Sequence, residues 1–202
     1  ARFTLRNDRV AELATDVQSL NTPSANQQRA GIRLEYVFDN TLDVSINIKN
    51  GTRYKIYSEI VRRFSLAYND EFEFDSGSGF LYVLGLDARH YQRLDKHSIL
   101  AVRLAAAGSY GQEKILYFLG GTDNWLFNDF NNDIPIPFDE AFAYQTLATN
   151  VCGFSQNIRN GNSYALVNAE LRVPIFRYLT KRTIRSNFLR NFQLMVFGDV
   201  GT

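Results

Sequence analysis

The sequence has few cysteines, few prolines and no excess of either charge, and these absences restrict the class of protein to which it can belong. Its 202 residues include one cysteine, one methionine, one tryptophan and four prolines. The single Cys152 excludes an internal disulfide, so cysteine usage does not define the compartment. Basic and acidic residues number 22 and 21, which leaves a formal net charge of +1. A nucleic-acid binder needs a strong basic field, so no nucleic acid is expected as a partner.

Long apolar runs are missing as well. No stretch of about 18 or more apolar residues exists, so the sequence predicts no transmembrane helix. A transmembrane β-strand needs only about ten residues of alternating polarity, which leaves a membrane location open. The chain begins at Ala1 without an initiator methionine or a signal-peptide pattern, and it ends directly after an apolar strand. We therefore expect it to be a piece of a longer protein.

Catalytic motifs are also absent from the sequence. The two histidines, His90 and His97, fall on a strand and at a turn, and neither is an obvious base for Cys152. There is no Gly-x-Ser-x-Gly motif, and Gly120-Gly121 lacks the following helix and Lys-Ser/Thr of a phosphate-binding loop. We predict that the chain is not an enzyme and that it has no cofactor.

What the sequence has in quantity is alternation of apolar and polar residues with a period of two, which indicates β-strands. About six or seven strands of 10–14 residues are predicted, longer than the typical 5–6 residues. In one of them Ile32, Leu34 and Tyr36 alternate with Arg33 and Glu35. Residues 1–28 are less clear, because they fit either a strand or a short helix. The predicted class is all-β, with residues 29–202 in one antiparallel sheet.

The connections between these strands alternate between short turns and long loops. Asn50-Gly51 predicts a tight turn, because both residues tolerate positive φ. The longest connection, about residues 108–161, is rich in aromatic residues, unlike a disordered tail, so we expect it to pack against something. Long strands, unequal loops and 27 Phe and Tyr residues favour a transmembrane β-barrel. A soluble β-sandwich remains the alternative, since its core is formed by the apolar face that a barrel turns to lipid.

Four segments follow one another in the order and spacing of one known family. Together they are spread over most of the range 30–201. They resemble the C-terminal barrel of the BamA/TamA-type outer-membrane assembly and polypeptide-transport superfamily. They are residues 36–43 with 49–53, residues 118–121, the group Val151, Cys152, Gly153 and Phe154, and residues 169–174 with 197–201. The resemblance implies a partial barrel of about six or seven strands, with residues 108–161 as a lid-like loop.

In that family the lid motif carries an arginine, which meets acidic residues on the facing inner wall of the barrel. By the resemblance, Glu170 and Asp199 match the wall carboxylates. Cys152 stands where the family has the arginine, and a thiol is only a weak hydrogen-bond donor. Either another cation compensates for the two carboxylates, or the lid is held in a different way. The candidates are Arg103, Arg159 and Arg172.

The external loop also contains a weak candidate for a calcium site. Four residues hold positions one, three, five and twelve of a calcium-binding loop, namely Asp129, Asn131, Asp133 and Glu140. Position six is Ile134, where an EF-hand needs glycine, and Pro135 restricts the turn. A solvated loop tip is the default interpretation, so we expect no bound metal.

The resemblance implies a location in the bacterial outer membrane and a role in helping polypeptides insert into or cross it. The implied partners are outer-membrane lipid, the remainder of the barrel, an upstream periplasmic domain, and client polypeptides or other outer-membrane proteins. Loss of the lid arginine keeps a second role open, in which the barrel anchors or exports an upstream domain. Two further alternatives are a structural subunit of an outer-membrane complex and a soluble β-sandwich that binds a partner.

Overall fold

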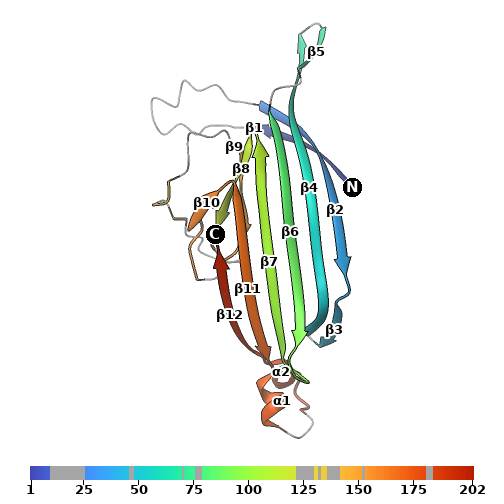
Figure 1. Ribbon diagram of the computed structural model, residues 1–202, viewed down its shortest axis with the longest axis vertical. Coiled ribbons are helices and arrows are strands. Elements are labelled where there is room, and N and C mark those ends of the chain that lie inside the picture. Colours follow the sequence, from blue (N-terminus) through green and yellow to red (C-terminus); the bar gives the residue numbers. More distant parts are fainter. Residues whose placement is uncertain are drawn as a thin grey trace.

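One large antiparallel sheet contains most of the described residues (Figure 1). The computed structural model describes residues 1–9, 26–45, 48–69, 71–75, 79–121, 130–131, 133–135, 142–151, 153–180 and 184–202. The predicted all-β, antiparallel fold is confirmed, but the sheet stays open, with β1 and β12 at its two edges, and does not close into a barrel. The main path follows the chain order β1 (Arg2–Arg9), β2 (Asn26–Asp39), β4 (Ile48–Asn69), β6 (Phe80–Arg93), β7 (Ile99–Gly111), β11 (Ser163–Val173) and β12 (Leu194–Gly201).

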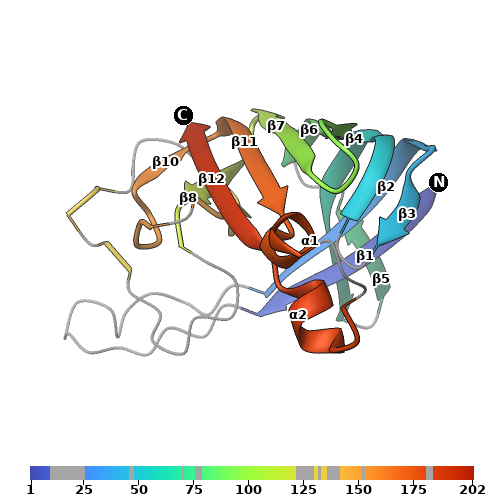
Figure 2. The same cartoon turned by 90° about the horizontal axis from the view of Figure 1, so that it is seen from below.

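Each long strand places alternate residues on opposite faces of this sheet. The register carries the faces from strand to strand: Tyr57 lies opposite Gly85, and Gly85 lies opposite Ala107. Figure 2, seen from below, shows that the sheet is curved, with β8, β10 and both helices on its concave side. We call the concave side the inward face and the convex side the outward face.

A second, smaller sheet lies on the inward face. β8 (Lys114–Leu119) pairs in parallel with β9 (Phe142–Thr149) and antiparallel with β10 (Arg159–Gly161). We call these three strands the inner sheet, and residues 112–162 the inner segment. We expected one continuous loop over residues 108–161. The structure differs, because β7 continues to Gly111 and β8 begins after only two intervening residues. The physical reason is that residues 115–119 are five consecutive apolar residues and all are buried, as in a strand covered on both faces.

The hairpin between β2 and β4 is longer than predicted. β3 (Leu42–Ser45) pairs with the start of β4, and Leu42 lies opposite Asn50. The prediction of a tight turn at Asn50-Gly51 is therefore wrong, since the paired strands continue beyond it. Gly51 does have a positive φ of 120°, and a Cβ there would lie 2.7 Å from the carbonyl oxygen of Asn40. Glycine is required at position 51 because the backbone of Asn40 approaches it closely within the hairpin, and not because it forms the turn at the end of the hairpin.

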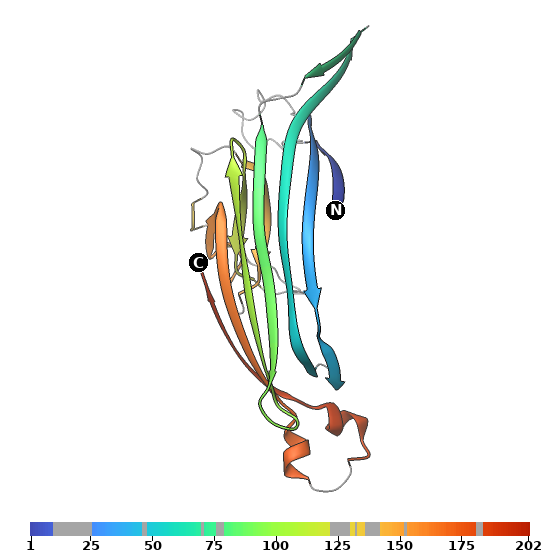
Figure 3. The same ribbon diagram turned by 45° about the vertical axis from the view of Figure 1, so that its right-hand side comes forward.

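The two ends of the large sheet carry different connections. At the upper end in Figure 1, β5 (Glu71–Asp75) pairs with the extension of β4, and the inner segment joins β7 to β11. At the lower end, residues 94–98 join β6 to β7, while α1 (Ile175–Leu179) and α2 (Asn187–Asn191) lie between β11 and β12. Figure 3 shows both helices projecting below the sheet. Neither α1 nor α2, nor any other helix in the described part of the chain, is long and apolar enough to cross a membrane.

Candidate functional site

The candidate site is the contact between the inner segment and the inward face of the large sheet. Its apolar part is formed by Ile115 and Tyr117 of β8, which pack with Val61, Val83 and Ala107 of the large sheet. Burying each large apolar side chain stabilises the contact by roughly 1.5–3 kcal/mol. Burial also raises the pKa of Tyr117 far above its ordinary value, so its hydroxyl stays protonated. The inner sheet is therefore a packed part of the fold.

Ser109, near the end of β7, ties both ends of the inner segment to the large sheet. Its side chain is fully buried. The hydroxyl Oγ accepts a hydrogen bond from the backbone N–H of Ile115 at 2.9 Å, and the carbonyl oxygens of Ile115 and Asn162 lie 3.1 Å and 3.0 Å from it as acceptors. The backbone N–H of Ser109 also donates to the Asn162 carbonyl at 2.9 Å. Ser109 on the inward face of the large sheet, which we call the wall, thus holds the inner segment both at its start, near Ile115, and at its end, at Asn162.

Glu113 of the inner segment makes two ion pairs with the large sheet. Its Oε2 lies 3.2 Å from Nη2 of Arg29, and its Oε1 lies 2.9 Å from Nη1 of Arg63. The two arginines are direct partners across β2 and β4. The Arg29 and Glu113 side chains are only 3% and 12% exposed. Since like charges opposite each other destabilise a sheet, the carboxylate neutralises a pair that would otherwise repel. Gly79 leaves room for it, because a Cβ there would lie 2.6 Å from Glu113 Oε1.

Arg103 of β7 makes the second polar contact between the wall and the inner sheet. Its Nη2 lies 2.9 Å from Oδ2 of Asp87, and its Nη1 donates to Oγ1 of Thr149, in β9, at 3.3 Å. Arg103 is one of the three cations that the sequence offers in place of the missing lid arginine. Its side chain reaches the inner sheet from the wall, so the direction of the contact is opposite to the one that the family resemblance implies.

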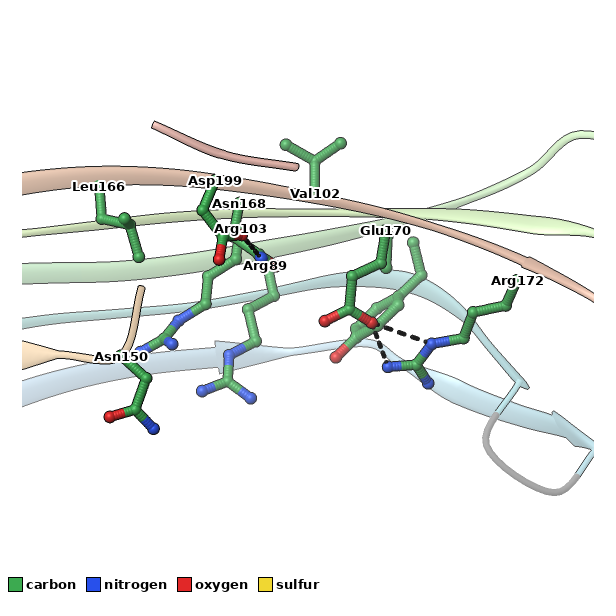
Figure 4. Close-up of a pocket in the computed structure, with 11 residues that line it drawn as sticks. Arg89, Val102, Arg103, Asn150, Leu166, Asn168, Glu170, Arg172 and Asp199 are labelled. Carbon is green, nitrogen blue, oxygen red and sulfur yellow. Dashed lines mark hydrogen bonds and ion pairs between the residues drawn. The ribbon is translucent and has the colours of Figure 1, made fainter. Parts of the chain in front are cut away.

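A polar cavity of about 230 Å³ adjoins this contact (Figure 4). Within the part of the chain that the structure describes, two buried polar atoms here, Arg103 Nε and Asn150 Oδ1, have no hydrogen-bond partner. The cavity can therefore hold water. Its charged and amide side chains come from β6, β7, β11, β12 and the residue after β9, and they are Arg89, Arg103, Asn150, Asn168, Glu170, Arg172 and Asp199.

Glu170 and Asp199 both line this cavity, and each has a partner on the large sheet itself. Oε2 of Glu170 lies 2.6 Å from Nη2 of Arg172 on the same strand. Oδ1 of Asp199 accepts a hydrogen bond from the amide of Asn168, its cross-strand partner. Arg172 thus lies beside one of the two carboxylates. Arg159 is exposed in β10 and does not line the cavity.

The motif that would face these carboxylates is only partly described. Cys152 lies outside the described residues. Val151 is buried with Leu119 and Leu166, Gly153 has a φ of 88°, and Phe154 is exposed. The Phe154 carbonyl accepts a hydrogen bond from the N–H of Gly121 at 2.9 Å. The predicted motif residues and the Leu-Gly-Gly turn are therefore neighbours in space.

The calcium candidates are held by local hydrogen bonds where they are described. Oδ1 of Asn131 accepts from the backbone N–H of Asp133 at 2.9 Å. The buried Asn157 donates to the Asn131 carbonyl at 2.8 Å. Asp129 and Glu140 lie outside the described residues. Across the ranges that the structure describes, no group of three or more His, Cys, Asp or Glu side chains is placed to hold a metal ion.

Sequence reasoning missed four residues that hold the inner segment: Arg29, Arg63, Ser109 and Glu113. The signal for Glu113 was its position just after a predicted strand, inside the stretch that was expected to fold back. No signal pointed to Arg29 and Arg63, because the sequence does not show which arginines face each other across two strands. Their pairing is a property of the register.

Comparisons of this chain with protein-family models, curated proteins and solved structures found no match of any of the three kinds. Its class is therefore defined here by the fold, an open all-β sheet that carries a smaller sheet on its concave face. Its function has to be argued from the geometry of the two faces.

Proposed function

We propose that the chain forms part of a membrane-spanning β-barrel in a bacterial outer membrane, with the inner segment as a lid in its lumen. One observation carries this proposal: the apolar face of the sheet is exposed, and the inner segment packs against the opposite, charged face. In a soluble β-sandwich the apolar face would be the buried one. In a transmembrane barrel the apolar face meets lipid and the polar face lines the interior.

The exposed apolar residues of the outward face extend across the whole sheet. Ile32 and Leu34 of β2 are 57% and 59% exposed, and Val196 and Val200 of β12 are 57% and 76% exposed. Between these strands lie Ile56, Ile60, Leu84, Leu104 and Val167, all exposed and all on the same face. Soluble monomers rarely expose contiguous apolar patches of more than a few hundred Å². A lipid environment gives this face a favourable contact.

The height of the outward band also fits a membrane. On β7 the outward positions run from Leu100 to Tyr110, which at about 3.3 Å per residue is roughly 33 Å along the strand. A strand tilted by about 40° would then span about 25 Å, the height of the apolar band of outer-membrane barrels.

The sheet edges support a barrel that is completed by further strands. An unpaired strand edge in hydrocarbon leaves backbone N–H and C=O groups without partners, at several kcal/mol for each group. β1 and β12 run in the same direction, because they are the first and last of seven antiparallel strands. Closure with antiparallel pairs throughout needs an odd number of added strands. Two copies of this sheet alone would meet in parallel pairs.

The proposed task is that of the superfamily that the sequence resembles: helping polypeptides insert into or cross the outer membrane. It is a non-enzymatic task, in which lipid, the rest of the barrel, an upstream periplasmic domain and client polypeptides are the partners. The inner segment supports this role, because a barrel with a lid in its lumen keeps its pore closed. Here the lid is held by wall arginines and a lid carboxylate.

A second role, anchoring or exporting an upstream domain, is favoured by the attachment of the inner segment. Ser109 holds both ends of the segment, and Glu113 is engaged by two wall arginines. A segment fastened at both ends serves equally well as a permanent plug. A structural subunit of a larger complex would use the same plug.

Extraction and gel migration test the membrane proposal. We expect the native protein to need detergent to leave the membrane and its band to shift between unheated and boiled samples. A soluble β-sandwich would be released by salt alone and would show no shift, and that outcome would refute the barrel.

A further inference from the structure

The connection between β11 and β12 has a composition unlike the rest of the chain. Residues 174–193 carry five of the 22 basic residues and none of the 21 acidic ones. Aliphatic and aromatic residues occupy eight further positions in the same stretch, five of them aromatic or leucine in α1 and α2. A segment that combines positive charge with large apolar side chains is typical of a surface that binds an acidic partner.

The apolar side chains of this segment are not used by the fold. No residue of α1 or α2 is buried. Leu179 of α1 and Phe188 of α2 are each 73% exposed. Phe192 stacks between Phe188 and Phe176, with ring centroids 6.0 Å and 5.4 Å away, and is itself exposed. Helices of one turn are not stable in isolation, so this pair needs packing from elsewhere.

Part of that packing comes from the neighbouring turn. The hydroxyl of Tyr178 lies 2.6 Å from Oγ of Ser98 and donates to Oδ2 of Asp95 at 3.1 Å. The Tyr178 ring also meets His97 edge-on at 5.9 Å. The segment is thus fixed to the lower end of β6 and β7, while Leu179 and Phe188 point into open space. It is a positioned surface with an exposed apolar side.

The place of the segment decides what kind of partner fits. Figures 2 and 3 show α1 and α2 on the concave side of the sheet, below its lower end. A lipid bilayer would lie against the outward face, on the other side of the sheet. The two helices therefore lie next to the space below the inward face, which a polypeptide can enter.

We propose that the described residues of this connection, 174–180 and 184–193, form a docking surface for an extended, acidic polypeptide segment with apolar side chains. Arg185 and Arg190 would meet its carboxylates, and Leu179 and Phe188 would pack against its apolar residues. This surface goes beyond the proposed membrane role, and only the choice of a polypeptide over lipid as its occupant rests on that role.

Peptide binding to the detergent-purified chain tests this surface. The probe is a fluorescein-labelled peptide in which glutamate alternates with leucine and phenylalanine, and its counterpart has lysine at the glutamate positions. Fluorescence anisotropy should show that only the acidic peptide binds and that its affinity falls with added NaCl. The double variant R185S/R190S should bind it about fivefold more weakly, since exposed charge pairs are individually weak. F188S should also weaken binding, whereas R159S, which removes an exposed arginine in β10, should not.

Equal binding of the acidic and lysine peptides, or unchanged affinity of R185S/R190S and F188S, would overturn the docking surface. So would deuterium-exchange protection of residues 175–192 by phosphatidylglycerol vesicles in the absence of protection by the peptide, since that result assigns the surface to lipid. The heat-shift assay on the same preparations keeps the two proposals apart. Peptide binding without a heat shift would remove only the membrane role, and a heat shift without peptide binding would remove only the docking surface.

Discussion

The two faces of the large sheet come from the same alternating pattern but differ in polarity and in what packs against them. The outward face carries Ile32, Leu34, Ile60 and Leu104 and is exposed. The inward face carries charged residues such as Arg29 and is in part covered by the inner segment. Hydrophobicity alone would bury the first face and expose the second. The comparison teaches that an apolar and a charged face do not by themselves define which side of a sheet is covered, and the proposed lipid surroundings account for the exposed apolar face.

The largest expected effect is on the inward face, at Glu113. The substitution Glu113→Ala removes the carboxylate that lies between the buried Arg29 and its cross-strand partner Arg63, which should cost about 3–5 kcal/mol of unfolding free energy. Urea unfolding in detergent measures it, together with protease cleavage within the inner segment. The matched control is Asp43→Ala, which removes an exposed pair with Lys49 and should cost at most about 1 kcal/mol. Equal losses in both variants would mean that the covered charges do not hold the inner segment.

The outward face is tested by placing a charge at its centre. Leu104→Lys should destabilise the protein by about 2–4 kcal/mol in a bilayer, because a lysine at the midplane loses its hydration. At an exposed position in water the same change should stay within about 0.5 kcal/mol. Unfolding in lipid vesicles measures the difference, with Leu94→Lys in the turn at residues 94–98 as the control. A neutral Leu104→Lys would break the proposed contrast between the faces.

Packing on the inward face depends on a glycine under an aromatic ring. A Cβ added at Gly85 would lie 2.0 Å from the ring of Tyr57. Gly85→Ala should therefore cost about 1–3 kcal/mol through forced movement of that ring. Gly198 in β12 has no atom within 4 Å of the same position, so Gly198→Ala should be near neutral. The double variant with Tyr57→Ala should recover part of the loss at Gly85, and simple additivity would show that the ring is not the cause.

The smallest effect concerns Asp95 at the lower end of the sheet. Hydrogen bonds from the backbone N–H of Lys96 and then from the Tyr178 hydroxyl lower its pKa below the ordinary value. A lowered pKa contributes stability that is present above the unfolded-state pKa of about 3.9 and is lost as the pH falls through the folded-state value. Carboxyl-carbon NMR titration should show the Asp95 pKa moving up in Tyr178→Phe. An unchanged pKa would mean that the contact between α1 and the turn does not persist in solution.

Much of the large sheet could be predicted from local patterns. Period-two alternation placed the strands from β2 onward, because side chains on a strand alternate between faces whatever the strand packs against. The hairpin at Asn50-Gly51 was misplaced, since a dipeptide that tolerates positive φ serves both at a tip and at a close approach within a hairpin. The inner sheet was expected as a loop, because short apolar runs such as residues 115–119 have no period of their own.

The candidate site was predicted only in part. Glu170, Arg172 and Asp199 share a cavity with Arg103, as their positions on polar strand faces indicated. Arg172, one of the three candidate cations, lies beside Glu170, whereas Asn168 as the partner of Asp199 was not foreseen. Contacts between neighbouring strands can be predicted only once the strand register is known. The register is fixed when the chain folds, and the sequence does not show it directly.

By itself, the sequence determined that this chain forms long antiparallel strands with one apolar and one charged face. It also determined that a stretch between β7 and β11 is too rich in apolar residues to remain a free loop. Only the tertiary structure decided which face is covered and that Glu113 meets Arg29, a residue 84 positions away along the chain. Such contacts depend on strand order, register and the curvature of the sheet, and these emerge from the packing of the whole chain.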